Sequence, residues 1–174
     1  MSRRILNAID KKPAAIEKEL DAIFFRAVFL RWGGRCIRCG AEPRRIQKVR
    51  IDKVSKIETA YEQLQNLTPH HFFCRSYWGT RWEPKNGFLL CYMCHIKWAQ
   101  TRHEEFRDKV IQMIGQEAFD RLKYQAYNGS KPDPFAMKHY LLQKIELFES
   151  TISSAVVEAP HLGRILKEVP RGTN

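Results

Sequence analysis

The stretch HHFFCRSYWGTRWEPKNGFLLCYMCH, residues 70–95, decides how this chain folds. It contains two short apolar runs, 70–73 and 88–90, and the segment between them is rich in turn-forming residues. Short apolar runs that are separated by turn signals pair as antiparallel strands. We therefore expect a β-hairpin here, followed by a helix that begins near Cys94 and runs towards His103.

Four of the five cysteines form two Cys-x-x-Cys pairs, Cys36/Cys39 and Cys91/Cys94. Two such pairs supply the four thiolates of a tetrahedral zinc site, and a closed four-sulfur site leaves no open position for a substrate. The pattern therefore predicts a structural Zn²⁺ ion, while a redox pair and four unconnected thiols are the alternatives. We expect the fifth cysteine, Cys74, to be a small buried hydrophobic residue.

The charge of the chain points to a polyanionic partner. The 174 residues include 30 Lys and Arg against 19 Asp and Glu, a net charge of +11, and more than half of this excess lies between Arg35 and Lys56. Nucleic acid fits better than an anionic membrane, because no long amphipathic basic helix accompanies the charge. A solvated basic face is the alternative. The residues of this segment that we predict to contact phosphates are Arg44, Arg45, Lys48 and Arg50.

The remaining sequence is mainly helical in pattern. We expect helices over residues 13–32, 104–127 with a bend at Gly115, and 134–149, with weak helical periodicity over 53–67 and an exposed strand over 44–52. The expected organisation is an N-terminal helical segment (1–34), a zinc-bearing core (35–103) with a basic insertion (41–69), C-terminal helices (104–149) and a tail (150–174). No apolar run approaches the roughly 20 residues that a bilayer requires, and the N-terminus lacks the apolar run of a signal peptide, so we expect a cytoplasmic protein with no membrane partner.

Polar residues recur around the predicted hairpin at a spacing that points to a site. His70 and His71 are adjacent on the first predicted strand, so their side chains face opposite sides. Asn86 lies in the turn before the second strand, and His95 follows Cys94 directly. Each residue alone has an ordinary explanation, since an Asn-Gly pair usually marks a turn. The four cysteines complete a zinc site without the histidines, so the joint spacing favours a second site.

The chain resembles the HNH nuclease motif in a short set of residues: His70, His71, Asn86, Cys91, Cys94 and His95. The segments GGRCIRCG, RWEPKN and LLCYMCH are similar to phage-type HNH proteins, and most of all to the NinG (Rap) recombination proteins. The resemblance covers about residues 16–127. It departs from that family in the long stretch between Cys39 and His70, and at His95, where the family often carries Asn. It implies an α+β fold, with a zinc-clamped ββα-metal core surrounded by helices, encoded by a phage or prophage.

The activity that the resemblance implies is divalent-metal-dependent endonuclease cleavage of DNA phosphodiester bonds. His71 would be the general base that takes a proton from the attacking water. His70 and His95 would hold one Mg²⁺ or Mn²⁺ ion, and Asn86 would orient the segment that contains His71. His103 would be either an extra ligand or a surface residue.

The segment between the two predicted strands adds basic and aromatic residues. We predict that Arg75 and Arg81 contact phosphates. Trp78 and Trp82 either stack on a distorted base or fill space over a small core.

Two alternatives to a general duplex endonuclease stay open. The resemblance to NinG points to a structure-selective nuclease that resolves branched DNA such as Holliday junctions. A non-catalytic zinc module for DNA binding or assembly is the other alternative. A homodimer also stays open, because cutting both strands of a junction requires two active sites.

Overall fold

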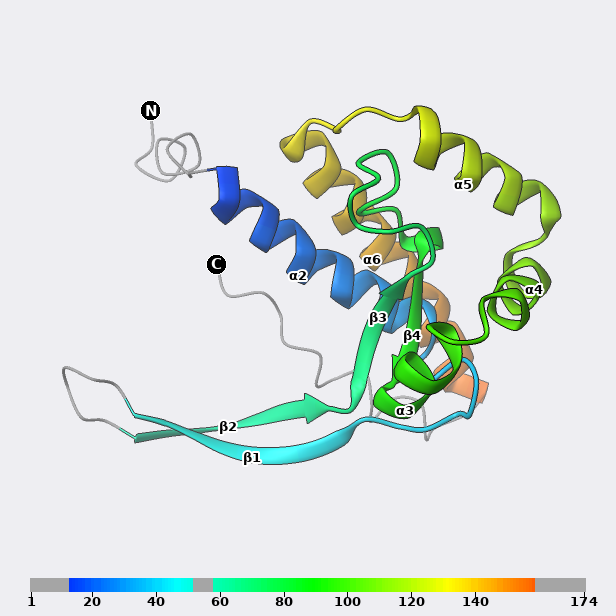
Figure 1. Ribbon diagram of the computed structural model, residues 1–174. Coiled ribbons are helices and arrows are strands. Elements are labelled where there is room, and N and C mark those ends of the chain that lie inside the picture. The colour runs from blue at the N-terminus through cyan, green and yellow to red at the C-terminus, as the bar shows by residue number, and fades with distance from the viewer. Residues whose placement is uncertain (1–12, 52–57, 159–174) are drawn as a thin grey trace, which may run out of the picture.

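The computed structural model describes residues 13–51 and 58–158, and the predictions that fall on 1–12, 52–57 and 159–174 lie outside this part. The elements in chain order are α2 (Pro13–Arg31), β1 (Arg44–Ile51), β2 (Glu58–Gln65), β3 (Leu67–His71), the 3₁₀ turn η1 (Pro84–Asn86), β4 (Gly87–Cys91), α3 (Tyr92–Cys94), the π-helical turn η2 (His95–Ala99), α4 (His103–Ile114), α5 (Gln116–Asn128) and α6 (Pro134–Glu158). The predicted α+β class is therefore confirmed (Figure 1). Each helix within the described ranges is too short or too polar to cross a membrane.

The centre of the molecule is the antiparallel pair β3–β4, which the two apolar runs predicted. Its register runs from Leu67 opposite Cys91 to His71 opposite Gly87. Along β4 the side chains alternate between the two faces, because successive residues of a strand point to opposite sides. The resulting two cores, one on each face of the pair, explain why β4 is a continuous apolar run.

The core on one face contains Phe88 and Leu90 of β4, which pack with buried residues of α4 and α5. The core on the other face contains Leu89, which packs with buried residues of α2 and α6, among them Phe24 and Leu141. Figure 1 shows this arrangement, with β3 and β4 lying between the α2–α6 pair and the α4–α5 pair.

Helix α6 packs along α2 and is longer than its sequence pattern predicted. Leu141 and Ile145, on the predicted apolar face, are buried in the shared core. An ion pair of 2.5 Å between Arg26 and Glu149 joins the two helices, and a second of 2.6 Å joins Glu19 and Lys138. The helix continues to residue 158, so the prediction of a tail from residue 150 is wrong for 150–158. The sequence pattern of this last stretch is weak, and Ile152 packs against the shared core.

The weak helical periodicity over 53–67 was misleading, because 58–65 is the strand β2. It pairs with β1 along its whole length, from Arg44 opposite Gln65 to Ile51 opposite Glu58. Cross-strand pairing overrides a weak local periodicity of this kind. Asn66, with φ of 74°, turns the chain between β2 and β3. Asparagine tolerates this left-handed conformation better than most residues.

The helix that was expected between Cys94 and His103 is broken into shorter pieces. One turn begins at Tyr92, before the predicted start, and a π-helical turn ends at Ala99. A new helix then begins at His103. The predicted bend at Gly115 is a complete break between α4 and α5, with φ of 83° at the glycine.

Gly87 lies against helix α2, and replacing it by alanine should destabilise the fold. A Cβ atom at this position would stand 2.3 Å from Cγ2 of Val28 and 2.8 Å from Cζ of Phe24, both in buried side chains. We expect Gly87→Ala to lower the free energy of unfolding by about 1–3 kcal/mol, measured by chemical denaturation. Val28→Ala opens space there, so the double variant should lose less than the sum of the two single changes. Additive losses would contradict the steric explanation.

Candidate metal centre and histidine site

The four cysteines of the two Cys-x-x-Cys pairs form one cluster, as the sequence predicted. The sulfur atoms of Cys36, Cys39, Cys91 and Cys94 all lie within 4.8 Å of one another, and those of Cys39 and Cys91 are 3.7 Å apart. Zn–S bonds of about 2.3 Å at tetrahedral angles place the sulfur atoms about 3.8 Å apart. The cluster could therefore hold a structural zinc ion.

The first pair lies on a tight turn that is fastened to the central strands. The N–H of Gly40 donates to the carbonyl of Cys36 at 2.9 Å, and the φ of 71° at this position suits glycine. The N–H of Ile37 donates to the carbonyl of Leu89 at 2.9 Å. The turn that presents Cys36 and Cys39 is thereby fixed to β4, the strand that ends in the second pair.

The second pair lies where β4 passes into α3. The N–H of Cys94 donates to Sγ of Cys91 at 3.5 Å, so the first cysteine caps the helix that carries the second. Burial raises the pKa of the Cys94 thiol far above its usual range, and the neighbouring Cys91 and Cys39 raise it further. Binding of a cation would displace the protons of such thiols, so the donor set suits a metal ion in its chemistry as well as in its geometry.

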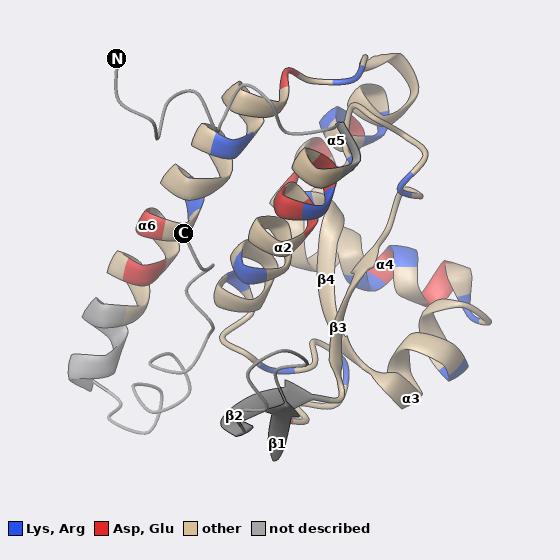
Figure 2. Cartoon of the chain, turned by 90° about the vertical axis from the view of Figure 1, so that its left-hand side faces the viewer, with Lys and Arg blue, Asp and Glu red and all other residues tan. Residues whose placement is uncertain are grey.

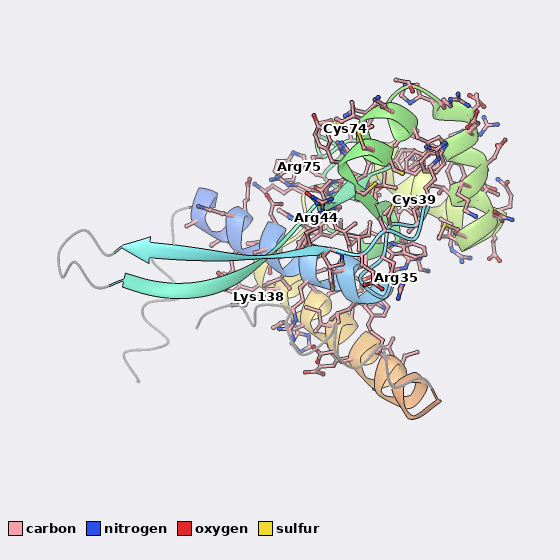
Figure 3. All side chains as sticks on the ribbon, turned by 90° about the horizontal axis from the view of Figure 1, so that it is seen from below. Arg35, Cys39, Arg44, Cys74, Arg75 and Lys138 are labelled. Carbon is pink, nitrogen blue, oxygen red and sulfur yellow. The ribbon has the colours of Figure 1, made fainter. Side chains whose placement is uncertain are left out.

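Cys74 lies outside the cluster and is exposed, so the prediction that it is buried is wrong. It follows Phe73, which takes the buried position at this point of the chain. Figure 3 shows Cys74 beside Arg75 and apart from Cys39.

The two histidines predicted to share a cation are brought together. The ring centroids of His70 on β3 and His95 at the start of η2 are 4.7 Å apart, with the rings nearly perpendicular at 75°. Burial, together with the charges of the nearby His95, His71 and His103, lowers the pKa of His70 to about 4. Burial also lowers the pKa of His95. Both imidazoles are therefore neutral at neutral pH, which is the form that binds a metal ion.

His71 lies on the other side of β3, as adjacent strand positions require. Its ring stacks on Phe24 at 4.7 Å, and its Nε2 lies 2.8 Å from the carbonyl oxygen of Arg81. A carbonyl oxygen only accepts hydrogen bonds, so Nε2 carries the proton and Nδ1 keeps its lone pair. Burial lowers the pKa of His71, which keeps this ring neutral. The arrangement leaves one fixed imidazole nitrogen that can take up a proton.

Asn86 is fully buried and joins the end of β3 to the segment that leads to Arg81. Its Oδ1 accepts from the N–H of Phe73 at 2.8 Å. Its Nδ2 donates to the carbonyls of Phe73 at 2.9 Å and Thr80 at 3.0 Å. Thr80 is next to Arg81, whose carbonyl holds His71. The amide of Asn86 therefore fixes the backbone on both sides of the histidine.

Asp21 of α2 is a residue of this region that sequence reasoning missed. Its Oδ1 accepts from Nε1 of Trp82 at 2.8 Å, and its Oδ2 accepts from Nη2 of Arg81 at 3.2 Å and from Arg75. Figure 2 shows the acidic positions of α2. An acidic pair four residues apart, Glu17 and Asp21, on a predicted helix in a basic chain was the available signal.

Arg81, which was predicted to contact phosphates, pairs with acidic residues of α2. Only 13% of its side chain is exposed, and its guanidinium lies within 3.5 Å of Glu17 and pairs with Asp21. The same group stacks on Trp78 and Trp82 at 4.8 and 4.9 Å. Trp82 is buried, so it fills the core, which was one of its two expected roles.

Arg75 is the more exposed arginine of this segment, with 55% of its side chain accessible. The other predicted phosphate contacts all lie on β1: Arg44, Arg45, Lys48 and Arg50. Arg44 is exposed at the start of the strand.

Comparisons of the chain with protein-family models, with curated proteins and with solved structures find no match.

Proposed function

We propose that the chain is a divalent-metal-dependent endonuclease that hydrolyses DNA phosphodiester bonds on a zinc-clamped ββα-metal core. One observation carries the proposal. Two antiparallel strands and the helical turn that follows them hold the ring centroids of His70 and His95 4.7 Å apart. His71, which follows His70 in the chain, has an imidazole oriented by a hydrogen bond. This combination supplies two neutral ligands beside a neutral base, which metal-assisted hydrolysis requires.

His70 and His95 would hold the Mg²⁺ or Mn²⁺ ion, which when bound supplies charge stabilisation to the phosphate and to the leaving oxygen. Two protein ligands leave positions for phosphate oxygens and water. We place the scissile phosphate across the end of β3. His70 and His71 face opposite sides of this strand, and His71 is its last residue, so a phosphate at the strand end could approach both imidazoles.

The base in this mechanism is Nδ1 of His71, which takes a proton from the attacking water. The carbonyl of Arg81 keeps its hydrogen bond to Nε2 and stabilises the imidazolium that forms. The charge of Asp21 also favours this cation, while the charges of Arg75 and Arg81 oppose it. Asn86 keeps the carbonyl and the strand end in place through its three hydrogen bonds. His103 lies near enough to His70 to affect its pKa, and we assign it no ligand role.

The experiment that tests the proposal is incubation with linear duplex, supercoiled plasmid and a four-way junction, with and without Mg²⁺ or Mn²⁺. We expect cleavage only when the divalent ion is present, read on denaturing gels. Preference for the junction would support the structure-selective alternative within the same mechanism. Absence of cleavage of every substrate with either ion would overturn the proposal in favour of a non-catalytic DNA-binding module.

A further inference from the structure

The β1–β2 hairpin distributes its charges unequally between its two faces. In the register of this pair, positions 44, 46, 48 and 50 of β1 share one face with positions 65, 63, 61 and 59 of β2. That face carries the basic residues Arg44, Lys48 and Arg50 and no acidic residue. The opposite face carries Arg45 together with Glu58 and Glu62. The register therefore places three basic positions and no acidic position on one face of the hairpin.

The hairpin also has the dimensions of a groove-binding ribbon. Figures 1 and 3 show it projecting away from the rest of the molecule. Each strand has eight residues, which at about 3.4 Å per residue gives a length of about 27 Å. The major groove of DNA admits a two-stranded β-ribbon. A face of such a ribbon with basic residues and no acidic residue complements the phosphates that line the groove.

The base of the hairpin adjoins the candidate site at both of its ends. Asn66 alone separates β2 from β3, the strand of His70 and His71. At the other end, a short segment connects β1 to the turn that carries Cys36 and Cys39. A duplex that lies along the hairpin would therefore pass beside the cysteine cluster, and β3 leads from there to His70 and His71.

We propose that the face formed by Arg44, Lys48 and Arg50 is a contact surface for duplex DNA, and that Arg45 on the opposite face takes no part. The sequence alone predicted phosphate contacts for all four residues, and the register separates them. Where the cut falls rests on the proposed function, while the binding itself does not. At about 3.4 Å per base pair, the hairpin covers about eight base pairs on one side of the scissile phosphate.

The binding test uses a fluorescent linear duplex without Mg²⁺ or Mn²⁺, with affinity measured over a range of KCl concentrations. Lys48→Gln and Arg50→Gln should each flatten the slope of log K against log [KCl] by about 0.9, because each removes one phosphate contact. Arg45→Gln is the matched control on the opposite face and should leave the slope unchanged. Equal melting temperatures of the three variants would show that folding does not cause the difference.

An equal flattening by Arg45→Gln would overturn the inference, and so would an unchanged slope in all three variants. If wild-type protein cuts DNA while the Lys48 and Arg50 variants bind like wild type, the inference fails and the proposed function stands. If the variants lose binding as expected and wild-type protein cuts nothing, the inference stands and the proposed function fails. Equal loss of affinity for a single-stranded oligonucleotide would overturn the assignment of a duplex groove.

Discussion

Replacing His71 by alanine should lower the rate of DNA cleavage by about 10²–10⁴-fold, because removing a general base costs that much. The zinc content and the affinity for DNA should stay close to wild type, since Nδ1 of this residue acts on water. Multiple-turnover cleavage at saturating Mg²⁺, with metal analysis and binding measured on the same preparation, checks both halves of the prediction. Cleavage by the variant at the wild-type rate would contradict the role of His71.

Three further variants separate the base from its neighbours. His95→Ala should also lose activity, but a raised Mg²⁺ concentration should restore part of it, because the change weakens a ligand and leaves the base in place. Asn86→Ala should give an intermediate loss, since it misorients the base. His139→Ala is the matched control, because this exposed histidine lies on α6 and outside the site, and it should cut like wild type.

Loss of zinc should unfold the region around β4 and α3. Structural zinc contributes about 10–16 kcal/mol of apparent binding free energy, which is coupled to folding. Cys36→Ser or Cys94→Ser should therefore lose the metal and the cooperative thermal transition, measured by metal analysis and circular dichroism. Cys74→Ser is the matched control and should keep about one equivalent of zinc, because the exposed Cys74 lies outside the cluster.

The same variants connect the zinc cluster to the proposed activity. His95 follows Cys94 directly, so a loosened cluster should also displace this histidine from His70. Extra Mg²⁺ should then fail to restore cleavage in Cys94→Ser, in contrast to His95→Ala. Less than about half an equivalent of zinc in wild-type protein with intact thiols would contradict the structural metal, since binding of this kind is tight.

The features that the sequence predicted well depend on local patterns. The helix up to Arg31 followed from regular apolar spacing ended by glycines, and the pairing of β3 with β4 followed from two apolar runs around a turn. The cysteine cluster followed from spacing alone, because Cys-x-x-Cys pairs have few other uses in a chain of this kind. The meeting of His70 with His95 was expected from the resemblance, and the structure brings the two rings together.

The features that were missed depend on partners far apart in the sequence. β2 forms because β1 lies beside it, and the residues of β2 alone do not reveal that pairing. Asp21 meets Trp82 across 61 positions, and the acidic pair of Glu17 and Asp21 does not by itself identify this partner. The acidic partners of Arg81, which was predicted to contact phosphates, were missed for the same reason, since they lie on α2. Local sequence patterns predict helices and strands, whereas the pairing of a buried charge with its partners depends on the folded molecule.

The pairing of α2 with α6 also imposes an order on how the protein matures during synthesis. The core on the Leu89 face of β4 needs α6, which is made after every strand and after α4 and α5. A nascent chain can therefore assemble the Phe88 and Leu90 face first, while the Leu89 face stays open to solvent. Phe24, against which His71 stacks, belongs to the core on the Leu89 face, which forms last. The histidine proposed as the base thus reaches its final packing only after α6 has been made.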